Sequence, residues 1–287
     1  MCIDSFKRME KFVNLLKSKI IQNKYLLVIS LFYFIFRLIY LDKLPIFNDE
    51  SIYLEWGYRE IHNPGYLYYS LYDSKQPFLM WIFGIMQDFF QNPLYAGRLV
   101  SVFTGFLTLL GLYKLGSYLF DKKVGMIASL LYVVVPLFSF YDRQALMESS
   151  LAAVGIWVGF CMLKFFENKS QKYAVFLGII LGIGFFIKST AFIFLISYIF
   201  SFFIVFYFSK KKGKLFENFF WSIGAFLISV SLLLINPTFW NTLKTNSRYS
   251  LTLNELLMFP IGNFLKSLLT NLGIPFLHLT PFIFLLS

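Results

Sequence analysis

Long apolar stretches alternate with short polar connections along almost the whole chain. A helix needs about 20 predominantly apolar residues to cross roughly 30 Å of bilayer hydrocarbon. Runs close to this length lie at about 25–41, 95–118, 124–141, 148–166, 172–188, 190–208 and 217–236. The pattern therefore predicts an all-α, polytopic membrane helix bundle with seven spans. A further apolar run extends from about 274 to 287.

One apolar segment, 77–90, is too short to cross comfortably and is interrupted by Gln87 and Asp88. If it does not cross, one side of the membrane receives basic connections and the other receives most of the acids, as the positive-inside rule requires. We therefore predict that 77–90 is an interfacial or re-entrant helix and that the N-terminus is cytoplasmic. The basic connections on the predicted cytoplasmic side contain Lys7, Arg8, Lys11, Lys17, Lys19, Lys24, Lys122, Lys123, Lys164, Lys169, Lys172, Lys210, Lys211, Lys212 and Lys214.

Composition excludes a water-soluble domain. Hydrophobic residues make up 58% of the chain and charged residues 14%, whereas about 25% are charged in ordinary soluble domains. The net charge of +11 fits a cytoplasmic face near anionic lipid, so no nucleic-acid partner is expected. Cys2 and Cys161 form neither a disulfide framework nor a zinc motif.

These boundaries predict three parts. Residues 1–24 form a basic amphipathic segment that lies on the inner leaflet. Residues 25–236 form the seven-span module, with a long outer loop at 42–95 that contains juxtamembrane helices and covers the bilayer surface. Residues 237–287 form an outer segment and the start of another span, so we expect the chain to be truncated. The predicted location is the plasma or inner membrane, with the active site on the extracytoplasmic side.

Polar residues with possible chemistry gather on the predicted outer side. Asp49 and Glu50 stand near the outer end of the first span, where Asn48 or Asp49 could simply cap a helix over 51–61. A carboxylate at a covered helix start could equally serve as a general base. Lys75 precedes Pro77, and its cation is either a snorkelling surface charge or a ligand for a phosphate.

Two further outer turns contain charges. Arg143 and Glu148 lie in the turn between the third and fourth spans, and arginine is well suited to bidentate phosphate binding; an ordinary polar turn is the alternative. Lys188 lies between two very apolar helices, where a cation snorkels or has a partner. Arg37 lies inside the first span, and ionisable residues there are candidates for function.

The order of these motifs resembles the GT-C membrane glycosyltransferases. The residues are DE-x-x-Y at Asp49, Glu50 and Tyr53, K-x-P at Lys75 and Pro77, A-L-x-E at 145–148, and Lys188 in a tight outer turn. More narrowly, the chain is similar over about 30–236 to the branch of the protein O-mannosyltransferases and the lipid A aminoarabinose transferase.

This resemblance implies a sugar donor on a polyprenyl or dolichyl phosphate and an inverting transfer to a hydroxyl of a lipid, glycan or protein acceptor. It implies Asp49 as base, with Glu50 and Glu148 as further acids of the site and Tyr53 lining the substrate. It also implies that Lys75 contacts the donor phosphate, and Lys188 matches a family lysine. We add Arg143 and Arg37 as further cations for that phosphate, because fixed cations stabilise the charge that develops on a leaving group.

Two residues depart from the family pattern. Ser74 stands where the aminoarabinose transferase has a glutamate implicated in metal binding, so we predict no metal and no cofactor, although a divalent metal stays open. Gln76 stands where many relatives have a second proline. The alternatives to an enzyme are a transporter or flippase for a lipid-linked precursor, which would place charges near the midplane, and a non-catalytic subunit of a membrane complex.

Overall fold

The computed structural model describes residues 24–210, 212–245 and 261–278. This part of the chain is all helical and contains no strand. The predicted inner-leaflet segment and most of the final apolar run lie outside the described residues. The longer helices are α2 (Lys24–Leu38), α3 (Asn48–His62), α4 (Phe78–Gln87), α5 (Pro93–Leu119), α6 (Lys122–Val134), α7 (Pro136–Asp142), α8 (Glu148–Asn168), α9 (Gln171–Ile187), α10 (Phe192–Phe208), α11 (Lys212–Leu234), α12 (Pro237–Thr245) and α14 (Ile261–His278). Short 3-10 turns are η1 (Leu41–Lys43), η2 (Pro64–Tyr66), η3 (Tyr69–Asp73) and η4 (Ser189–Ala191).

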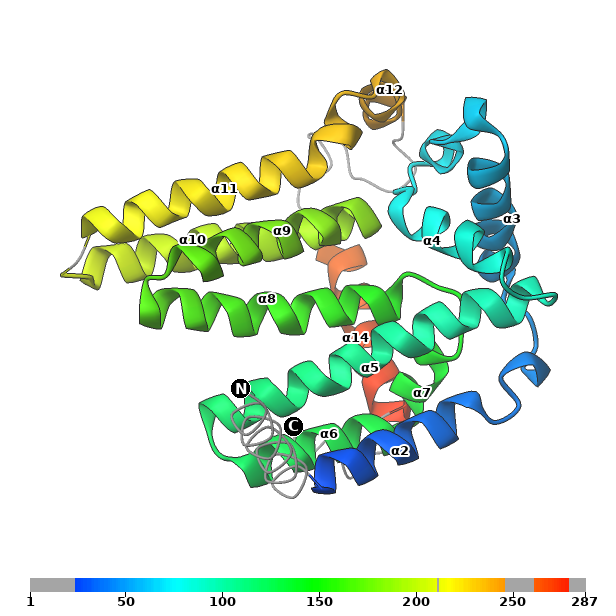
Figure 1. Cartoon of the computed structure of the whole chain (residues 1–287), viewed down its shortest axis with the longest axis horizontal. Helices are drawn as coiled ribbons and strands as arrows, with labels where there is room; N and C mark the ends of the chain where they lie inside the picture. Colours follow the sequence, from blue (N-terminus) through cyan, green and yellow to red (C-terminus); the bar gives the residue numbers. More distant parts are fainter. Residues whose placement is uncertain (1–23, 211, 246–260, 279–287) are drawn as a thin grey trace, which may run out of the picture.

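The long helices run roughly parallel or antiparallel in a layered bundle (Figure 1). Neighbouring pairs in the packing are α2 with α6, α6 with α5, α5 with α8, α8 with α9, and α9 with α11. Among the described residues, five helices are long and apolar enough to cross a membrane, or six if the bent α6–α7 pair counts as one span. The apolar α9 is shorter than these. The chain is therefore a polytopic helical membrane protein.

The outward side chains of the bundle are those of a protein in lipid. Phe203 on α10 is 62% exposed, and Ile228 on α11 is 76% exposed. In α2, the buried residues Ile29, Tyr33 and Arg37 follow a helical spacing along one face. These runs are helical because the backbone in hydrocarbon must satisfy its own hydrogen bonds. The exposed apolar faces of the helices are suited to contact with lipid.

Small residues allow a close approach of the helices α9 and α11. A Cβ added at Gly178 would collide with the backbone carbonyl of Ser222, and one added at Gly182 would collide with the side chain of Ser229. Spacing small residues one turn apart is a common way to bring helix backbones together in membranes. Helices α10 and α11 thereby pack into the same bundle as α8 and α9.

The segment 77–90 contains a short apolar helix of ten residues, and its interfacial or re-entrant position stays a prediction. Its helix α4 packs against α3, where Gly57 and Gly84 bring the two backbones together. Arg98, near the start of α5, donates hydrogen bonds to the carbonyls of Leu41 (2.8 Å) and Leu44 (3.1 Å), which follow α2. The end of α2 and the start of α5 therefore lie at the same end of the bundle, which we call the α3 end.

The opposite end contains the turns between α5 and α6, α8 and α9, and α10 and α11, and we call it the basic end. Lys169 Nζ donates to Ser209 Oγ (2.6 Å), and Asn218 Nδ2 donates to the Lys169 carbonyl (2.7 Å), so two of these turns are tied together. Asp121 caps α6 by accepting from the Val124 amide (2.8 Å), a favourable N-cap arrangement.

Two local features differ from the expected ones. The span expected at 124–141 is broken at Val135, where the axis turns by 69° between α6 and α7. Pro136 explains the break, because proline disfavours helical geometry at the residue before it and Val135 is extended (φ −70°, ψ 123°). Helix α3 begins before residue 51, with Phe47 at the N-cap position, so neither Asn48 nor Asp49 caps it.

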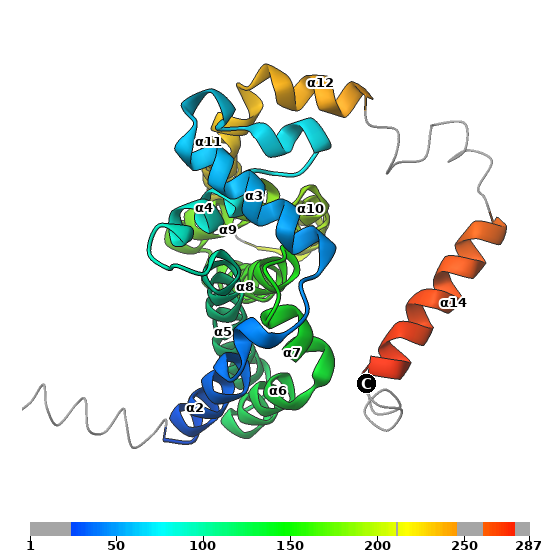
Figure 2. The ribbon, with the colours of Figure 1, turned by 90° about the vertical axis from the view of Figure 1, so that its right-hand side faces the viewer.

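Helix α14 has no extensive packing against the bundle. Figure 2 shows it standing apart from the other helices, and Leu269 on it is 71% exposed. Helix α12, in contrast, contacts η3 and α11 at the α3 end. The division of the chain at about 236 into a span module and a following segment stays our proposal.

Candidate active site

Helix α3 is held at both ends by buried carboxylates. Glu50, in its first turn, is fully buried and forms a two-pronged ion pair with Arg98 of α5: Nε to Oε1 at 2.8 Å and Nη2 to Oε2 at 2.7 Å. The same carboxylate accepts from the amides of Phe47 (2.9 Å) and Ala145 (2.7 Å). Glu50 therefore joins α3, α5 and the turn before α8, and its oxygens are fully occupied by protein donors.

At the other end of α3, Glu60 holds the loop that leads to Lys75. Glu60 is buried, and its Oε1 accepts from the Ser70 amide at 2.7 Å. The Ser70 carbonyl in turn accepts from the Lys75 amide at 3.1 Å. Burial raises the pKa of Glu60 to about 7, against the lowering effect of its hydrogen bonds with Ser70. The position of Lys75 thus depends on α3 through two consecutive hydrogen bonds.

Asp49 lies beside Glu50 in sequence but has a different environment. Its side chain is half-buried, and the Tyr53 hydroxyl, one turn along, donates to Asp49 Oδ2 at 3.5 Å. Burial, followed by the negative charges of Asp49 and Glu148, raises the pKa of Tyr53 above its usual range, and Asp73 adds to the shift. Tyr53 therefore marks a point where carboxylates from α3, α8 and η3 come near one another.

Glu148 and Lys188 form a pair that is open to solvent on one side. Lys188 Nζ lies 2.7 Å from Glu148 Oε1, and their side chains are 31% and 37% exposed, respectively. Glu148 lies in the first turn of α8, where a carboxylate is stabilised by the helix dipole. Lys188 is the C-cap of α9, with extended backbone geometry. We call Asp49, Tyr53, Glu148 and Lys188 the α3-end cluster.

An apolar cavity of about 440 Å³ lies between α4, α5, α8 and α9. Three of its lining residues lie within three positions of a charged residue in the chain: Phe78 follows Lys75, Ser150 follows Glu148, and Ile187 precedes Lys188. The cavity continues along the helices to Trp157 and Phe176. It is an elongated apolar space with charged residues at one end.

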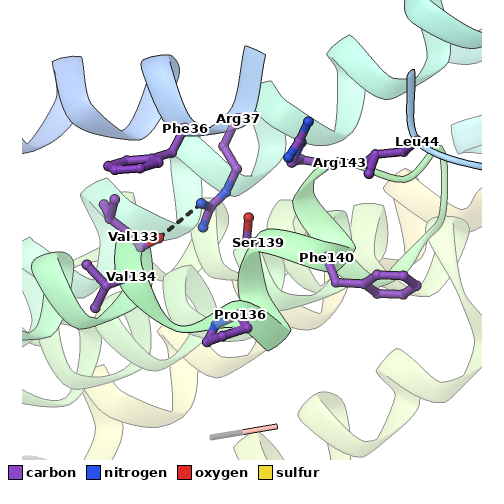
Figure 3. Close-up of a pocket in the computed structure, with 9 residues that line it drawn as sticks. All are labelled: Phe36, Arg37, Leu44, Val133, Val134, Pro136, Ser139, Phe140 and Arg143. Carbon is purple, nitrogen blue, oxygen red and sulfur yellow. Dashed lines mark hydrogen bonds between the residues drawn. The ribbon is translucent and has the colours of Figure 1, made fainter. Parts of the chain in front are cut away.

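Arg37 and Arg143 do not join the α3-end cluster. Both line a second cavity, between α2, α6 and α7 (Figure 3). Arg37 is completely buried, pairs with Asp142 (3.0 Å) and donates to the carbonyls of Val133 and Tyr132 (both 3.0 Å). Arg143 Nη2 donates to the carbonyls of Ile39 (2.6 Å) and Tyr40 (3.1 Å) at the end of α2. The grouping of all four predicted cations around one phosphate therefore has no support in these contacts.

Sequence reasoning missed Arg98, although a signal for it existed. Arg98 lies within the predicted span 95–118 and is completely buried, and an ionisable residue inside an apolar run is a default candidate for a special role. The same criterion had selected Arg37.

The described ranges contain no group of three His, Cys, Asp or Glu side chains arranged to hold a metal ion; the absence of a metal stays a prediction.

The fold and this end of the bundle define a multi-span helical membrane protein with paired charges beside an apolar cavity. Residues 74–240 match the model of the dolichyl-phosphate-mannose-protein mannosyltransferase family. This match covers more than half of the chain, and the chain belongs to that family. No individual curated protein matches it. Family membership points to a glycosyltransferase of the mannosyltransferase type that uses a dolichyl-phosphate sugar. Asp49, Glu50 and Tyr53 precede the matched residues.

Proposed function

We propose that the chain transfers a sugar from a polyprenyl-phosphate donor to an acceptor hydroxyl, with inversion at the anomeric carbon. The observation that carries this proposal is the position of the Glu148–Lys188 pair (2.7 Å) next to the end of an elongated apolar cavity. A polyprenyl chain is a fitting occupant for such a space, and its phosphate would then lie near Lys188 and Lys75.

In the proposed reaction the acceptor oxygen attacks the anomeric carbon, and Asp49 takes the hydroxyl proton. The bond between that carbon and the phosphate oxygen breaks, and its electrons leave with polyprenyl phosphate. Asp49 suits the role of base because it is half-buried and hydrogen-bonded to Tyr53. General-base catalysis typically contributes about 10²–10⁴-fold in rate.

Lys75 and Lys188 would stabilise the departing phosphate, since fixed cations in a site that excludes water act more strongly than solvent does. Glu148 would hold the Lys188 ammonium group in place through their contact at 2.7 Å. Glu50, by contrast, is saturated by protein donors, so we assign it the positioning of α3. Arg37 and Arg143 are left out of the donor site because they line the other cavity.

We place the site on the extracytoplasmic side of a plasma or inner membrane. This orientation is supported by the lysines of the basic end, including Lys122, Lys172 and Lys212, because cytoplasmic connections carry an excess of Lys and Arg. The acceptor is a lipid, a glycan or a protein hydroxyl.

The test uses membranes that contain the full chain and dolichyl-phosphate [³H]mannose as donor. Transfer of label to endogenous acceptors is measured for the wild type and for Asp49→Asn, with Glu55→Gln as matched control, because Glu55 is an exposed acid of the same helix. We expect Asp49→Asn to lower the rate at least about 100-fold and Glu55→Gln to have no effect. Full activity of Asp49→Asn would refute Asp49 as base. Movement of label across sealed vesicles without a new glycosidic bond would favour a flippase.

A further inference from the structure

The second cavity, between α2, α6 and α7, has a volume of about 700 Å³ and is not used by the proposed reaction. It lies where the α6–α7 axis bends by 69°, so the break at Pro136 opens a space that a continuous span would fill. In Figure 3 Arg37 and Arg143 reach this space from α2 and from the turn after α7, and Ser139 lies between them and Pro136.

The charges around this cavity are not balanced. Arg37 pairs with Asp142 and Arg98 pairs with Glu50, but Arg143 has no ion pair with a carboxylate among the described residues. Its Nη2 is bound to two carbonyls, and its Nε is buried without a hydrogen-bond partner in that part of the chain. Burial and then the positive charges of Arg37 and Arg98 lower the pKa of Arg143. A negative group beside Arg143 would relieve this excess of positive charge.

Apart from Ser139, the rest of the cavity wall is apolar, and three of its side chains are exposed on the surface of the bundle. Phe36, Val134 and Phe140 line it and are 53%, 55% and 46% exposed, respectively. A free anion would gain nothing from these side chains, whereas a hydrocarbon chain would bury apolar surface against them. The wall therefore complements a molecule with an anionic head at Arg143 and a hydrocarbon chain along α2, α6 and α7.

We infer that this cavity binds an anionic phospholipid, with the phosphate on Arg143 and an acyl chain against Phe36, Val134 and Phe140. Arginine matches phosphate oxygens well, because its planar guanidinium presents several donors. The site adjoins the segment that leads into α3: Leu44 lines the cavity, and Arg143 holds the carbonyls of Ile39 and Tyr40. A bound lipid would thus contact the segment that connects α2 to α3.

Native mass spectrometry of the purified full chain tests this inference. The probes are palmitoyl-oleoyl phosphatidylglycerol and the zwitterionic phosphatidylcholine with the same chains. We expect the wild type to bind phosphatidylglycerol about tenfold more tightly, and Arg143→Gln to lose this preference. Arg143→Lys should keep most of it. Arg59→Gln is the matched control, because Arg59 is exposed and paired with Glu55 on α3; it should bind as the wild type does.

A second variant covers the case in which Arg143→Gln does not fold. Ser139→Trp fills the cavity without removing a charge, and it should reduce binding of phosphatidylglycerol about tenfold. Equal binding of the two lipids by the wild type, or unchanged binding by Ser139→Trp, would overturn the inference. So would displacement of phosphatidylglycerol by millimolar inorganic phosphate, which would indicate an anion site, or by equimolar polyprenyl phosphate, which would indicate a donor site. These measurements of lipid binding do not depend on transfer activity, so they can fail or succeed separately from the proposed function.

Discussion

Asp49 and Glu50 are neighbours in sequence, yet they have opposite surroundings. Glu50 is fully buried, accepts from Arg98 and two backbone amides, and joins three parts of the fold. Asp49 is half-buried and has Tyr53 as a hydrogen-bond partner at 3.5 Å. The same contrast separates the buried Glu50–Arg98 pair from the half-exposed Glu148–Lys188 pair. Carboxylates of the first kind join helices together, and we propose that those of the second kind contact the substrate.

Removing the carboxylate of each pair tests this contrast most strongly. Glu50→Ala leaves Arg98 buried without its partner and should destabilise the protein by about 3–5 kcal/mol, or prevent folding. Glu148→Ala, in the half-exposed pair, should cost only about 0–1 kcal/mol. Thermal unfolding is followed by a thiol dye on buried Cys161, in a Cys2→Ser background. Equal losses of stability in the two variants would contradict the proposed difference between the buried and the half-exposed pair.

Neutralising Lys188 separates function from stability at the half-exposed pair. If Lys188 stabilises the departing phosphate, Lys188→Gln should lower the transfer rate about 10²–10³-fold while the unfolding temperature stays within a few degrees of the wild type. Lys172→Gln, at the basic end, is the control and should keep full activity. An active Lys188→Gln would leave the pair with a structural role alone.

The buried Glu60 makes the stability of the protein depend on pH. Its pKa is raised from 4.5 to about 7, so the folded chain keeps a proton that the unfolded chain has already lost. Unfolding therefore releases a proton between about pH 4.5 and 7, and the free energy of unfolding falls as the pH rises through that window. Glu60→Gln should abolish this part of the decrease in unfolding temperature between pH 5 and pH 8. Glu55→Gln should leave it unchanged, and an unchanged pH profile in Glu60→Gln would contradict the assignment.

The contact between α3 and α4 gives the smallest expected effect. A methyl group added at Gly84 would meet the backbone of Gly57, and such overpacking costs about 1–3 kcal/mol. Gly65 has no neighbour within 4 Å of an added Cβ, so Gly65→Ala is a matched control with an expected change within about 0.5 kcal/mol. The dye assay on Cys161 measures both. A Gly84→Ala protein as stable as the control would mean that α3 and α4 are not tightly packed.

The helices could be predicted because a helix in lipid must be apolar over most of its length, and such runs are visible in the sequence. The membrane class followed from that pattern, and the family followed from the order of the motifs. The helix break at Pro136 could also have been predicted, because a proline inside an apolar run interrupts a helix. The break there creates the second cavity.

The site was less predictable because its contacts join distant parts of the chain. Nothing local indicates that Glu50 meets Arg98, 48 positions away, or that Lys188 meets Glu148 across two helices. A short motif marked Asp49 and Glu50, and a predicted outer turn marked Arg143, but neither signal tells which side chain is buried. Burial decides that, and burial depends on the packing of α3 against α4 and α5.

Helix α3 is fixed at both of its ends, by Glu50 and by Glu60, and this makes its length in residues a constraint on the whole site. Each added residue rotates the following part of an α-helix by about 100° and advances it by about 1.5 Å. A single insertion between these two glutamates would thus leave one of them facing lipid or solvent instead of its partner. The ten-residue interval between the two anchors therefore cannot change by one residue without the loss of one of these contacts.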